Sequence, residues 1–294
     1  MPVITCFGET LWDIFPDEKK IGGAPLNVAC RLHALGSRVH LISRVGKDDN
    51  GAKILKYLEH RGMISNGIQI DDTHATGLVM VKLDSLNTAS YTIEKPAAWD
   101  FISSDEQTLY KVRSSDAIIF GSLACRSETS KNTLFTLLKE KVFKVFDANL
   151  RPPHYSYELV LKLMKKADFI KLNDEELEEI CEFLSIDGKS HQEQIPELSK
   201  HTGCSNICVT LGKNGAILFT NRKMYRNPGY KVTVKDTVGA GDSFLASLIH
   251  QFLLDKNPQD ALDYSCAVGS LVASKSGANE SVSEDEIQQL LEKY

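Results

Sequence analysis

The residues best suited to chemistry lie between positions 235 and 244, where the sequence reads Lys-Asp-Thr-Val-Gly-Ala-Gly-Asp-Ser-Phe. Gly239, Ala240 and Gly241 are small, so the backbone can approach a ligand closely at these positions. An apolar helical pattern follows, and the first turn of a helix has unpaired N–H groups and a partial positive charge. This stretch therefore predicts a site for a phosphate group or a developing anion. Asp242 stands at the same helix start, where an Asp can also serve simply as an N-cap.

The elements that must position this stretch alternate between strands and helices. Short apolar runs predict buried strands, and longer amphipathic stretches predict helices. We expect strands at residues 3–7, 39–45, 117–120, 142–146, 169–172 and 207–211. We expect helices at residues 26–35, 52–60, 156–166, 244–253, 261–274 and 284–292. This alternation predicts an α/β fold with a largely parallel sheet that is covered on both faces.

One region departs from the alternation. Residues 76–82 and 89–95 are rich in β-forming residues, and residues 84–87 between them predict a turn, so the segment is expected to form a hairpin. Residues 13–22 could add to this hairpin. A small sheet that projects from an α/β core would suit a lid, and an edge hairpin packed on the core is the alternative interpretation.

The composition limits the functions to consider. The chain has 294 residues, within the range of one large α/β unit, so we expect residues 1–294 to form a single domain. The net charge is 34 − 39 = −5 and no long basic run occurs, so nucleic acid and anionic membranes are not expected as partners. No apolar run reaches membrane-spanning length. Seven scattered cysteines and the lack of a signal peptide predict reduced thiols in a cytoplasmic protein.

Five motifs, in order along nearly the whole chain, resemble those of the ribokinase-like (PfkB) carbohydrate kinases. Residues 236–242 resemble the C-terminal signature of that family, and residues 22–29 resemble its N-terminal Gly-Gly signature. Residues 8–13 resemble the strand end where the family keeps a sugar-binding Asp, residues 173–176 fit its Asn-x-x-Glu motif, and residues 210–216 resemble its nucleotide-site turn. The resemblance implies a ribokinase-like three-layer α/β/α core with a mainly parallel sheet, and a small β lid from about residues 13–22 and 76–96.

The resemblance also implies an ATP-dependent sugar kinase with roles for the residues of the glycine-rich turn. The backbone N–H groups of Gly239, Ala240 and Gly241 would form an anion hole for the transferred phosphoryl group. Asp242 would accept the proton of the attacking sugar hydroxyl. The sugar would be bound by polar and small residues of the N-terminal motifs and the lid, namely Glu9, Asp13, Gly22, Gly23, Asn27 and Lys95.

On the nucleotide side, the resemblance implies a site for ATP and Mg²⁺. Asn173 and Glu176 would hold Mg²⁺ through water, since this ion keeps much of its water shell. The same two residues have the spacing of a capping box, and both interpretations can hold at once. The nucleotide would be bordered by Asn173, Glu176, Thr210, Gly212, Gly215 and Gly277. The family often has a monovalent-cation site, which would place K⁺ near Asp236, Val238 and Ser281.

Asp147 and Arg151 belong to the stretch Asp-Ala-Asn-Leu-Arg, which resembles a family motif after a central strand. The two residues could serve the nucleotide phosphates or Mg²⁺, and an internal ion pair is an equally plausible role. The chain has neither the P-loop motif nor the protein-kinase motifs, so those two classes of kinase are excluded.

Finer features of the motifs bear on the acceptor. The Gly-Gly-Ala-Pro-x-Asn form of residues 22–27 and the combination of Glu9 with Asp13 resemble fructokinases more than ribokinases, so fructose is expected. Glu94 and Lys95 stand where fructokinases frequently have an Arg, which keeps 2-keto-3-deoxygluconate, ribose and a nucleoside as alternatives. A non-catalytic sugar or nucleotide sensor is a further alternative, against which the intact glycine-rich turn argues. Lid strands in this family often pair between subunits, so a homodimer is also expected.

Overall fold

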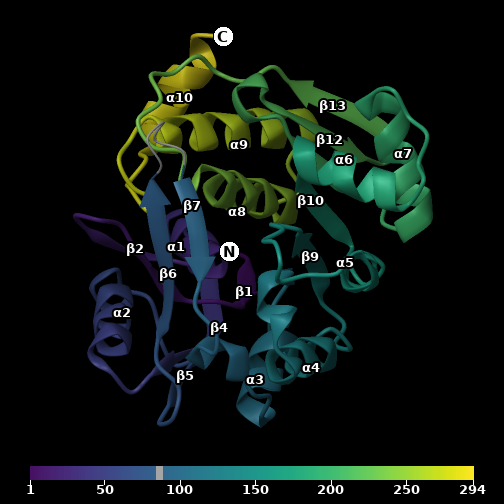
Figure 1. Ribbon diagram of the computed structural model, residues 1–294. Coiled ribbons are helices and arrows are strands. Elements are labelled where there is room, and N and C mark those ends of the chain that lie inside the picture. The colour runs from purple at the N-terminus through teal and green to yellow at the C-terminus, as the bar shows by residue number, and fades with distance from the viewer. Residues whose placement is uncertain (84–88) are drawn as a thin grey trace.

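The computed structural model describes residues 1–83 and 89–294, and its larger β-sheet lies between layers of helices (Figure 1). This sheet has nine strands in the order β13-β12-β11-β10-β9-β8-β1-β4-β5. The strands are β1 (Val3–Phe7), β4 (Arg38–Gly46), β5 (Ile68–Asp71), β8 (Ala117–Gly121), β9 (Phe143–Asp147), β10 (Phe169–Asn173), β11 (Ile207–Thr210), β12 (Ala216–Thr220) and β13 (Lys223–Asn227). Only β12 and β13, at one edge, run antiparallel to their neighbours, so the predicted largely parallel sheet is confirmed.

Helices cover both faces of this sheet and enclose two apolar cores. One core is formed with α1 (Ala24–Ala34), α2 (Asp49–His60), α8 (Ala240–Leu253) and α9 (Pro258–Ala273). The other is formed with α3 (Glu106–Arg113), α4 (Glu128–Leu137), α5 (Tyr157–Met164), α6 (Asp174–Phe183) and α7 (His191–Thr202). The last helix, α10 (Glu284–Glu292), packs on α9. The result is the three-layer α/β/α architecture expected from the alternation of elements.

The central strands have apolar residues on both faces because both faces are buried. In β8, Ile119 contributes to the core that contains α1 and α8, whereas Ile118 and Phe120 contribute to the opposite core. Successive side chains of a strand point to opposite faces, so a strand between two helical layers needs a continuous apolar run. This is why such runs marked the strands in the sequence.

A second, four-stranded sheet has the order β3-β2-β6-β7. It consists of β2 (Leu11–Ile14), β3 (Lys19–Gly22), β6 (Gly77–Leu83) and β7 (Ala89–Ile93). The antiparallel pairing of β6 with β7 confirms the predicted hairpin, whose predicted turn at residues 84–87 lies outside the described residues. Residues 13–22 do add to this sheet, through β2 and β3. One expectation is corrected: residues 8–13 were expected to be the end of a strand, but Asp13 lies within the separate strand β2 of this small sheet.

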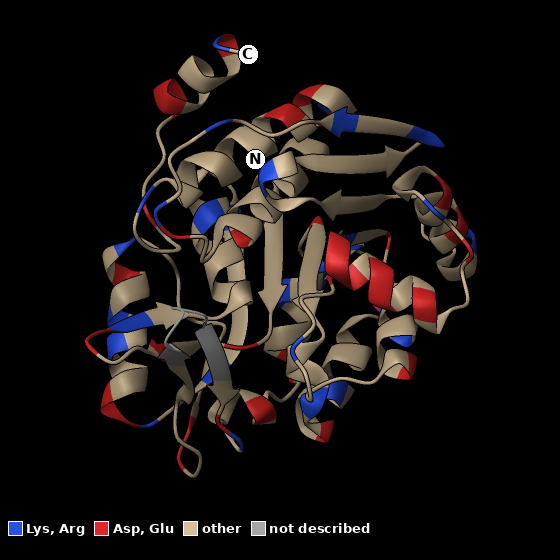
Figure 2. Ribbon diagram, turned by 45° about the horizontal axis from the view of Figure 1, so that its top comes forward, with Lys and Arg blue, Asp and Glu red and all other residues tan. Residues whose placement is uncertain are grey.

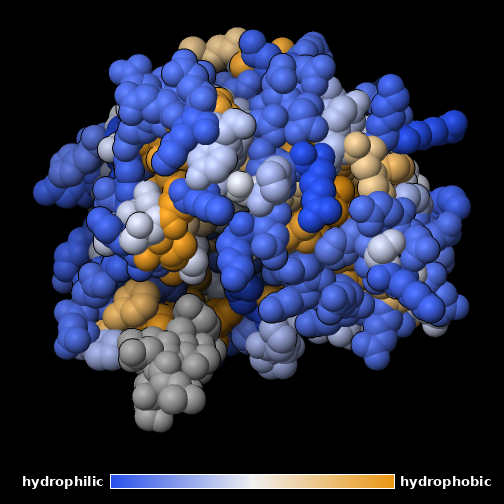
Figure 3. Space-filling model, turned by 90° about the horizontal axis from the view of Figure 1, so that it is seen from above, coloured by the Kyte–Doolittle hydropathy of each residue, from blue (hydrophilic) through white to orange (hydrophobic). Residues whose placement is uncertain are grey.

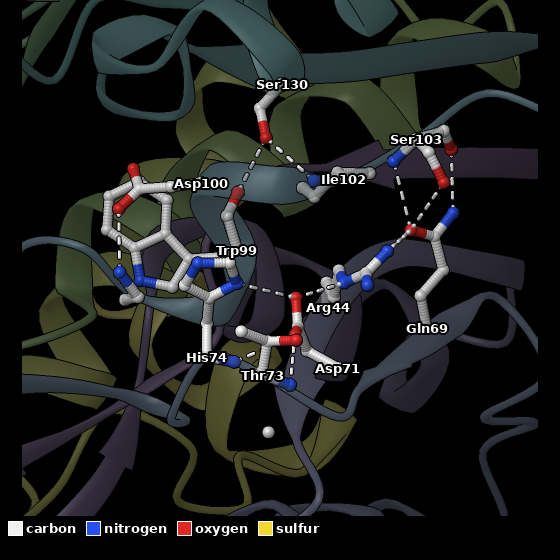
Figure 4. Close-up of polar contacts among 12 residues, drawn as sticks. Arg44, Gln69, Asp71, Thr73, His74, Trp99, Asp100, Ile102, Ser103 and Ser130 are labelled. Atoms are coloured by element: carbon white, nitrogen blue, oxygen red, sulfur yellow. Dashed lines mark hydrogen bonds and ion pairs between the residues drawn. The ribbon is translucent and has the colours of Figure 1, made fainter.

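Polar contacts hold the chain on both sides of the β6–β7 hairpin against the core (Figure 4). The carboxylate of Asp71, at the end of β5, accepts from the Nε of Arg44 at 2.7 Å and from the backbone N–H of His74 at 2.8 Å. Next to it, the Oγ of Ser130 donates to the carbonyl oxygen of Trp99 at 2.7 Å and accepts from the N–H of Ile102 at 2.9 Å. The bonds of Asp71 fix the segment before β6 and those of Ser130 fix the segment after β7, so both ends of the hairpin are anchored to the core.

The surface is polar and carries both signs of charge. Hydrophilic residues cover most of the face shown in Figure 3, and acidic residues concentrate on α6 (Figure 2). All seven cysteines are buried free thiols. None of the helices in the described part of the chain combines the length and the apolar character needed to cross a membrane.

Candidate active site

The site lies where the carboxyl ends of the central parallel strands meet the start of α8. Open α/β sheets bind ligands at this edge, because parallel strands deliver their terminal loops to the same side. Glu9 follows β1, Asp147 ends β9, and Asn173 ends β10. The start of α8 is close to the same edge, since a Cβ built on Gly241 would lie 3.6 Å from the Nζ of Lys171 in β10.

Glycine is required at the residue that caps α8. Gly239 has φ 75°, in the left-handed region, and a Cβ there would collide with Ala278. The N–H of Ala240 donates to the carbonyl oxygen of Thr237 at 3.2 Å. Within residues 1–83 and 89–294, the N–H groups of Gly239 and Gly241 have no acceptor. Two of the three donors predicted for an anion hole are therefore unengaged.

Asp242 is in the first turn of α8, so Gly239 and not Asp242 is the N-cap. Its Oδ2 accepts from the Nδ2 of Asn27, a buried residue of α1, at 2.8 Å. Burial raises the pKa of Asp242 to about 6, and the nearby carboxylate of Asp147 adds to the rise, while Asn27 and Lys171 oppose it. The carboxylate is therefore ionised at neutral pH and is a better base than an exposed aspartate.

Two further carboxylates interact electrostatically with Asp242. Glu9 is 3% exposed, and burial raises its pKa to about 7, with smaller increases from Asp242 and Asp147. Burial likewise raises the pKa of Asp13 to about 6, and Asp242 adds to the rise while Arg151 opposes it. The Oε2 of Glu9 is a buried atom with no hydrogen-bond partner among the described residues. These acceptors leave hydrogen-bonding capacity for a polyhydroxylated ligand.

Gly22 and Gly23 allow the chain to pass close to these carboxylates. A Cβ on Gly22 would collide with the carboxylate of Asp13, and a Cβ on Gly23 would lie 2.5 Å from the carbonyl oxygen of Glu9. Gly23 also has φ 107°. The structure thus brings together five of the residues predicted for the sugar, which are Glu9, Asp13, Gly22, Gly23 and Asn27.

Lys95, the sixth residue predicted for the sugar, is not brought to this cluster by its contacts. Its exposed side chain donates from Nζ to the carbonyl oxygen of Arg126 at 3.2 Å. The side chain of Arg126 is itself buried and paired with Asp100 at 2.8 Å. The side chain of Lys95, which follows β7, therefore contacts the segment after β8 through a backbone carbonyl group.

Lys171 is a site residue that was missed in the sequence. Its Nζ donates to the Oδ1 of Asp147 at 2.9 Å, and both side chains are buried. Burial alone would lower the pKa of Lys171, but the charges of Asp147 and Glu176 outweigh it and raise the pKa. The signal was available, because a lone lysine inside the apolar strand Phe-Ile-Lys-Leu-Asn requires a buried partner. Asp147 thus has an internal ion pair with Lys171, while Arg151 is exposed.

Asn173 and Glu176 form the capping box that their spacing predicted. The Oδ1 of Asn173 accepts from the N–H of Glu176 at 2.7 Å, and the Oε2 of Glu176 accepts from the N–H of Asn173 at 2.8 Å. The Oε1 of Glu176 accepts from the N–H of Leu150 at 2.7 Å. Both carboxylate oxygens are thus held by backbone donors, which fix the start of α6 beside Lys171.

The predicted nucleotide turn follows β11. The Oγ1 of Thr210 donates to the carbonyl oxygen of Leu172 at 3.3 Å, and Gly212 has φ 54°. Gly215 has φ 82°, and a Cβ there would collide with the carbonyl oxygen of Asn227. Gly277, with φ 113°, precedes the Ala278 that packs against Gly239. Gly277 therefore lies near the start of α8.

The residues predicted for a monovalent cation have the following contacts. The Oδ1 of Asp236 accepts from the N–H of Val238 at 3.0 Å, and its Oδ2 lies 3.7 Å from the Nζ of Lys20. The carbonyl oxygen of Ser281 accepts from the Nζ of Lys275 at 2.6 Å. The described residues contain no group of three or more His, Cys, Asp or Glu side chains that could hold a metal.

Comparison with known proteins shows which family the chain resembles. A family model described as pfkB family carbohydrate kinase matches residues 5–285. A fructokinase of Solanum tuberosum is 30% identical over 302 residues, which cover 94% of this chain and 91% of that protein.

Solved structures are also similar. An uncharacterized sugar kinase of Pyrococcus horikoshii in complex with ATP has a TM-score of 0.79 and 26% identity, over 98% of this chain and 99% of that one. A fructokinase of Xylella fastidiosa with bound ATP has a TM-score of 0.87 over 99% of this chain and 98% of that one. At 22% identity, the latter similarity shows the fold alone.

Proposed function

We propose that this chain, which belongs to the pfkB family of carbohydrate kinases, transfers the γ-phosphoryl group of ATP to a hydroxyl group of fructose. The observation that carries the proposal is the position of Asp242. Its carboxylate is fixed by Asn27 at the start of α8, next to the unengaged N–H of Gly241 and in the field of Glu9 and Asp13. A proton acceptor and an anion site are thereby adjacent, as phosphoryl transfer to an alcohol requires.

The acceptor hydroxyl would be oriented by Asp242. In a loose transition state the proton leaves late, so the carboxylate mainly positions the attacking oxygen and then accepts its proton. Asp13, Glu9 and Asn27 supply further acceptors and donors for the remaining hydroxyls. Gly22 and Gly23 let the chain approach them without a side chain in between.

The charge of the transferred group would be stabilised at the start of α8. The N–H groups of Gly239 and Gly241 and the partial positive charge of the helix end are preorganised donors for an oxyanion. The ammonium group of Lys171, which is paired with Asp147, lies nearby, 3.6 Å from the position of a Cβ on Gly241. This lysine supplies the cation that a P-loop would otherwise supply.

The site also fits a Mg²⁺ ion. The Oδ2 of Asp147 is buried and lacks a hydrogen-bond partner in the described part of the chain. This oxygen would be able to coordinate Mg²⁺ or to accept a hydrogen bond from a metal-bound water. When bound with ATP, Mg²⁺ neutralises phosphate charge. Asn173 and Glu176 would act on it only through water, because backbone donors already occupy the oxygens of Glu176. We also propose that K⁺ binds near Asp236, Val238 and Ser281.

Fructose is proposed as the acceptor because the curated relative of Solanum tuberosum is a fructokinase, and because Glu9 and Asp13 both lie at the site. We place the reaction in the cytoplasm, since all seven cysteines are buried free thiols.

The test is a coupled assay of ADP formation from Mg-ATP with a panel of acceptors. Fructose, ribose, 2-keto-3-deoxygluconate, glucose and adenosine should be compared, with and without K⁺. We expect fructose to have the highest kcat/KM. A higher kcat/KM for another acceptor would replace fructose in the proposal, and binding of sugar and ATP without turnover would favour a sensor.

A further inference from the structure

A chain of two side-chain amides runs from a distant loop to Asp242. The loop comprises residues 274–283, between α9 and α10. The Nδ2 of Asn279, in this loop, donates to the Oδ1 of Asn27 at 2.9 Å. The Nδ2 of Asn27 in turn donates to the Oδ2 of Asp242 at 2.8 Å. Residues from three separate parts of the sequence thus form one directed series of hydrogen bonds.

The direction of this series has a physical cause. An ionised carboxylate only accepts hydrogen bonds, so Asn27 must turn its NH₂ group and not its oxygen towards Asp242. The Oδ1 of Asn27 then points the other way, where the NH₂ group of Asn279 meets it. A reversed Asn27 would place an amide oxygen against the carboxylate and two NH₂ groups against each other. The carboxylate of Asp242 thus sets the orientation of the Asn27 amide, and Asn279 stabilises that orientation through the donor that it presents to Oδ1.

The backbone of the loop is held where this contact is made. The Nη2 of Arg61 donates to the carbonyl oxygen of Asn279 at 2.9 Å, and the Nη2 of Arg31 donates to that of Glu280 at 2.7 Å. Arg31 is buried, and its Nε also donates to the Oγ of Ser243, the neighbour of Asp242, at 3.2 Å. The loop and the start of α8 are thus tied to the same helix, α1. The position of Asn279 relative to Asp242 is therefore fixed by the side chains of Arg31 and Arg61.

We infer that Asn279 is a positioning residue for phosphoryl transfer, which acts by holding the amide of Asn27 in the orientation that donates to Asp242. The inference rests on the proposed function, in which Asp242 orients and deprotonates the acceptor hydroxyl. Asn279, in the 274–283 loop, would thus support the reaction without touching either the acceptor hydroxyl or the transferred phosphoryl group. Among residues 1–83 and 89–294, the second N–H of Asn27 Nδ2 has no acceptor, so the same orientation also presents a donor to the sugar.

The inference has a consequence for the pH dependence of turnover. Asp242 is surrounded by the carboxylates of Asp147, Glu9 and Asp13 and by the cations of Lys171 and Arg151. Within this set, the hydrogen bond from Asn27 favours the ionised form of Asp242. Reversal of Asn27 would remove this effect and so raise the pKa of Asp242. The acid limb of the kcat profile would then move to higher pH.

The test compares Asn279→Leu and Asn279→Asp with the wild type. Leu removes the donor without adding charge, and Asp offers an acceptor that would draw the NH₂ group of Asn27 away from Asp242. We expect kcat with the preferred sugar at pH 7 to fall about threefold to tenfold for Asn279→Leu and about tenfold to a hundredfold for Asn279→Asp. The acid limb of the kcat profile should also move to higher pH, and it should move further for Asn279→Asp than for Asn279→Leu. The KM for ATP should stay unchanged in both variants.

Two controls separate the effect of the Asn27 amide from other effects of a change in the loop. Glu280→Gln changes an exposed side chain of the same loop, and its kcat and acid limb should match those of the wild type. The profile of Asn279→Asp should be recorded at low and high concentrations of choline chloride. A through-space effect of the new charge would shrink with salt, whereas a reversed amide would persist. A shift that disappears at high salt, or an Asn279→Leu variant with wild-type kcat and acid limb, would overturn the inference.

A readout without turnover separates this inference from the proposed function. The side-chain amide resonances of Asn27 can be followed by ¹H–¹⁵N NMR between pH 5 and pH 8 and identified from their loss in Asn27→Asp. They should titrate with Asp242 in the wild type, and with a higher midpoint in Asn279→Leu. If the wild type phosphorylates no sugar but the midpoint is higher in Asn279→Leu than in the wild type, the proposed function fails and the hydrogen-bond series stands. If turnover is found but the midpoints are equal, only the inference about Asn279 fails.

Discussion

The Nζ of Lys171 donates to the Oδ1 of Asp147 at 2.9 Å, with 9% of the lysine side chain and 6% of the aspartate side chain exposed. The other carboxylate oxygen, Oδ2, has no hydrogen-bond partner among the described residues. Asp147 also lines a cavity together with Glu9 and Asn149. The pair therefore combines a cation near the start of α8 with an acceptor that remains available to a ligand.

Replacement of one member of this pair should impair both stability and activity. Lys171→Met leaves Asp147 buried without its counter-ion, which typically costs about 3–5 kcal/mol of unfolding free energy. We expect the double variant Asp147→Asn/Lys171→Met to recover part of that stability, but not kcat. Urea unfolding and steady-state kinetics measure the two effects. A Lys171→Met protein as stable as the wild type would show that the pair is not needed for the fold.

Loss of the carboxylate at position 242 should mainly affect turnover. We expect Asp242→Asn to lower kcat by roughly a thousandfold or more, while ATP binding stays close to that of the wild type and the melting temperature does not fall, since the substitution removes a buried charge. Since the pKa of Asp242 is raised to about 6, wild-type kcat should fall as pH drops through that value. A kcat above about a tenth of the wild-type value would contradict the assignment of Asp242 as base.

The fold could be predicted from the sequence because its elements follow local rules. Each strand in the middle of the larger sheet is buried on both faces, so it appears as a short apolar run, and the two strands at 3–7 and 117–121 begin where predicted. The hairpin of β6 and β7 was similarly visible from its β-forming residues. The placement of Asp13 was wrong because the short strand β2 has only four residues and follows β1 closely.

The site could be predicted only where one stretch of chain carries its features. The turn at Gly239 to Asp242 and the capping box of Asn173 and Glu176 are local, and both are present. The pairing of Lys171 with Asp147 joins two strands, and the contact of Asn279 with Asn27 spans most of the chain. Such contacts depend on how the sheet and helices assemble, which residue spacing along a single sequence does not encode.

The sugar side of the site should be separable from the nucleotide side. Asp13 lies in the small sheet next to Gly22, whereas the predicted nucleotide turn follows β11 of the larger sheet. We expect Asp13→Ala to raise the KM for the sugar at least tenfold, with the KM for ATP changed less than twofold, since a lost charge-assisted hydrogen bond is worth about 1.5–3 kcal/mol. Asp17→Ala, at an exposed position between β2 and β3, is the matched control. Equal effects on both KM values would remove Asp13 from the sugar site.

The buried carboxyl group of Glu9 should make the unliganded protein less stable as pH rises. Burial raises its pKa from 4.5 to about 7 in the folded state, so between these values the folded protein binds more protons than the unfolded chain. Stability then falls as pH increases through this window, and the whole cost of the buried charge is present above the folded-state pKa.

Gln is neutral at every pH and nearly isosteric with Glu, so Glu9→Gln removes this cost. Relative to the wild type, the variant should gain about 1–3 kcal/mol of unfolding free energy between pH 5 and pH 8. Urea unfolding of the two proteins at both pH values gives this difference directly. Glu59→Gln, at an exposed position of α2, should show no such gain. A wild type and a Glu9→Gln variant whose stabilities change in parallel with pH would mean that Glu9 ionises with its unfolded-state pKa.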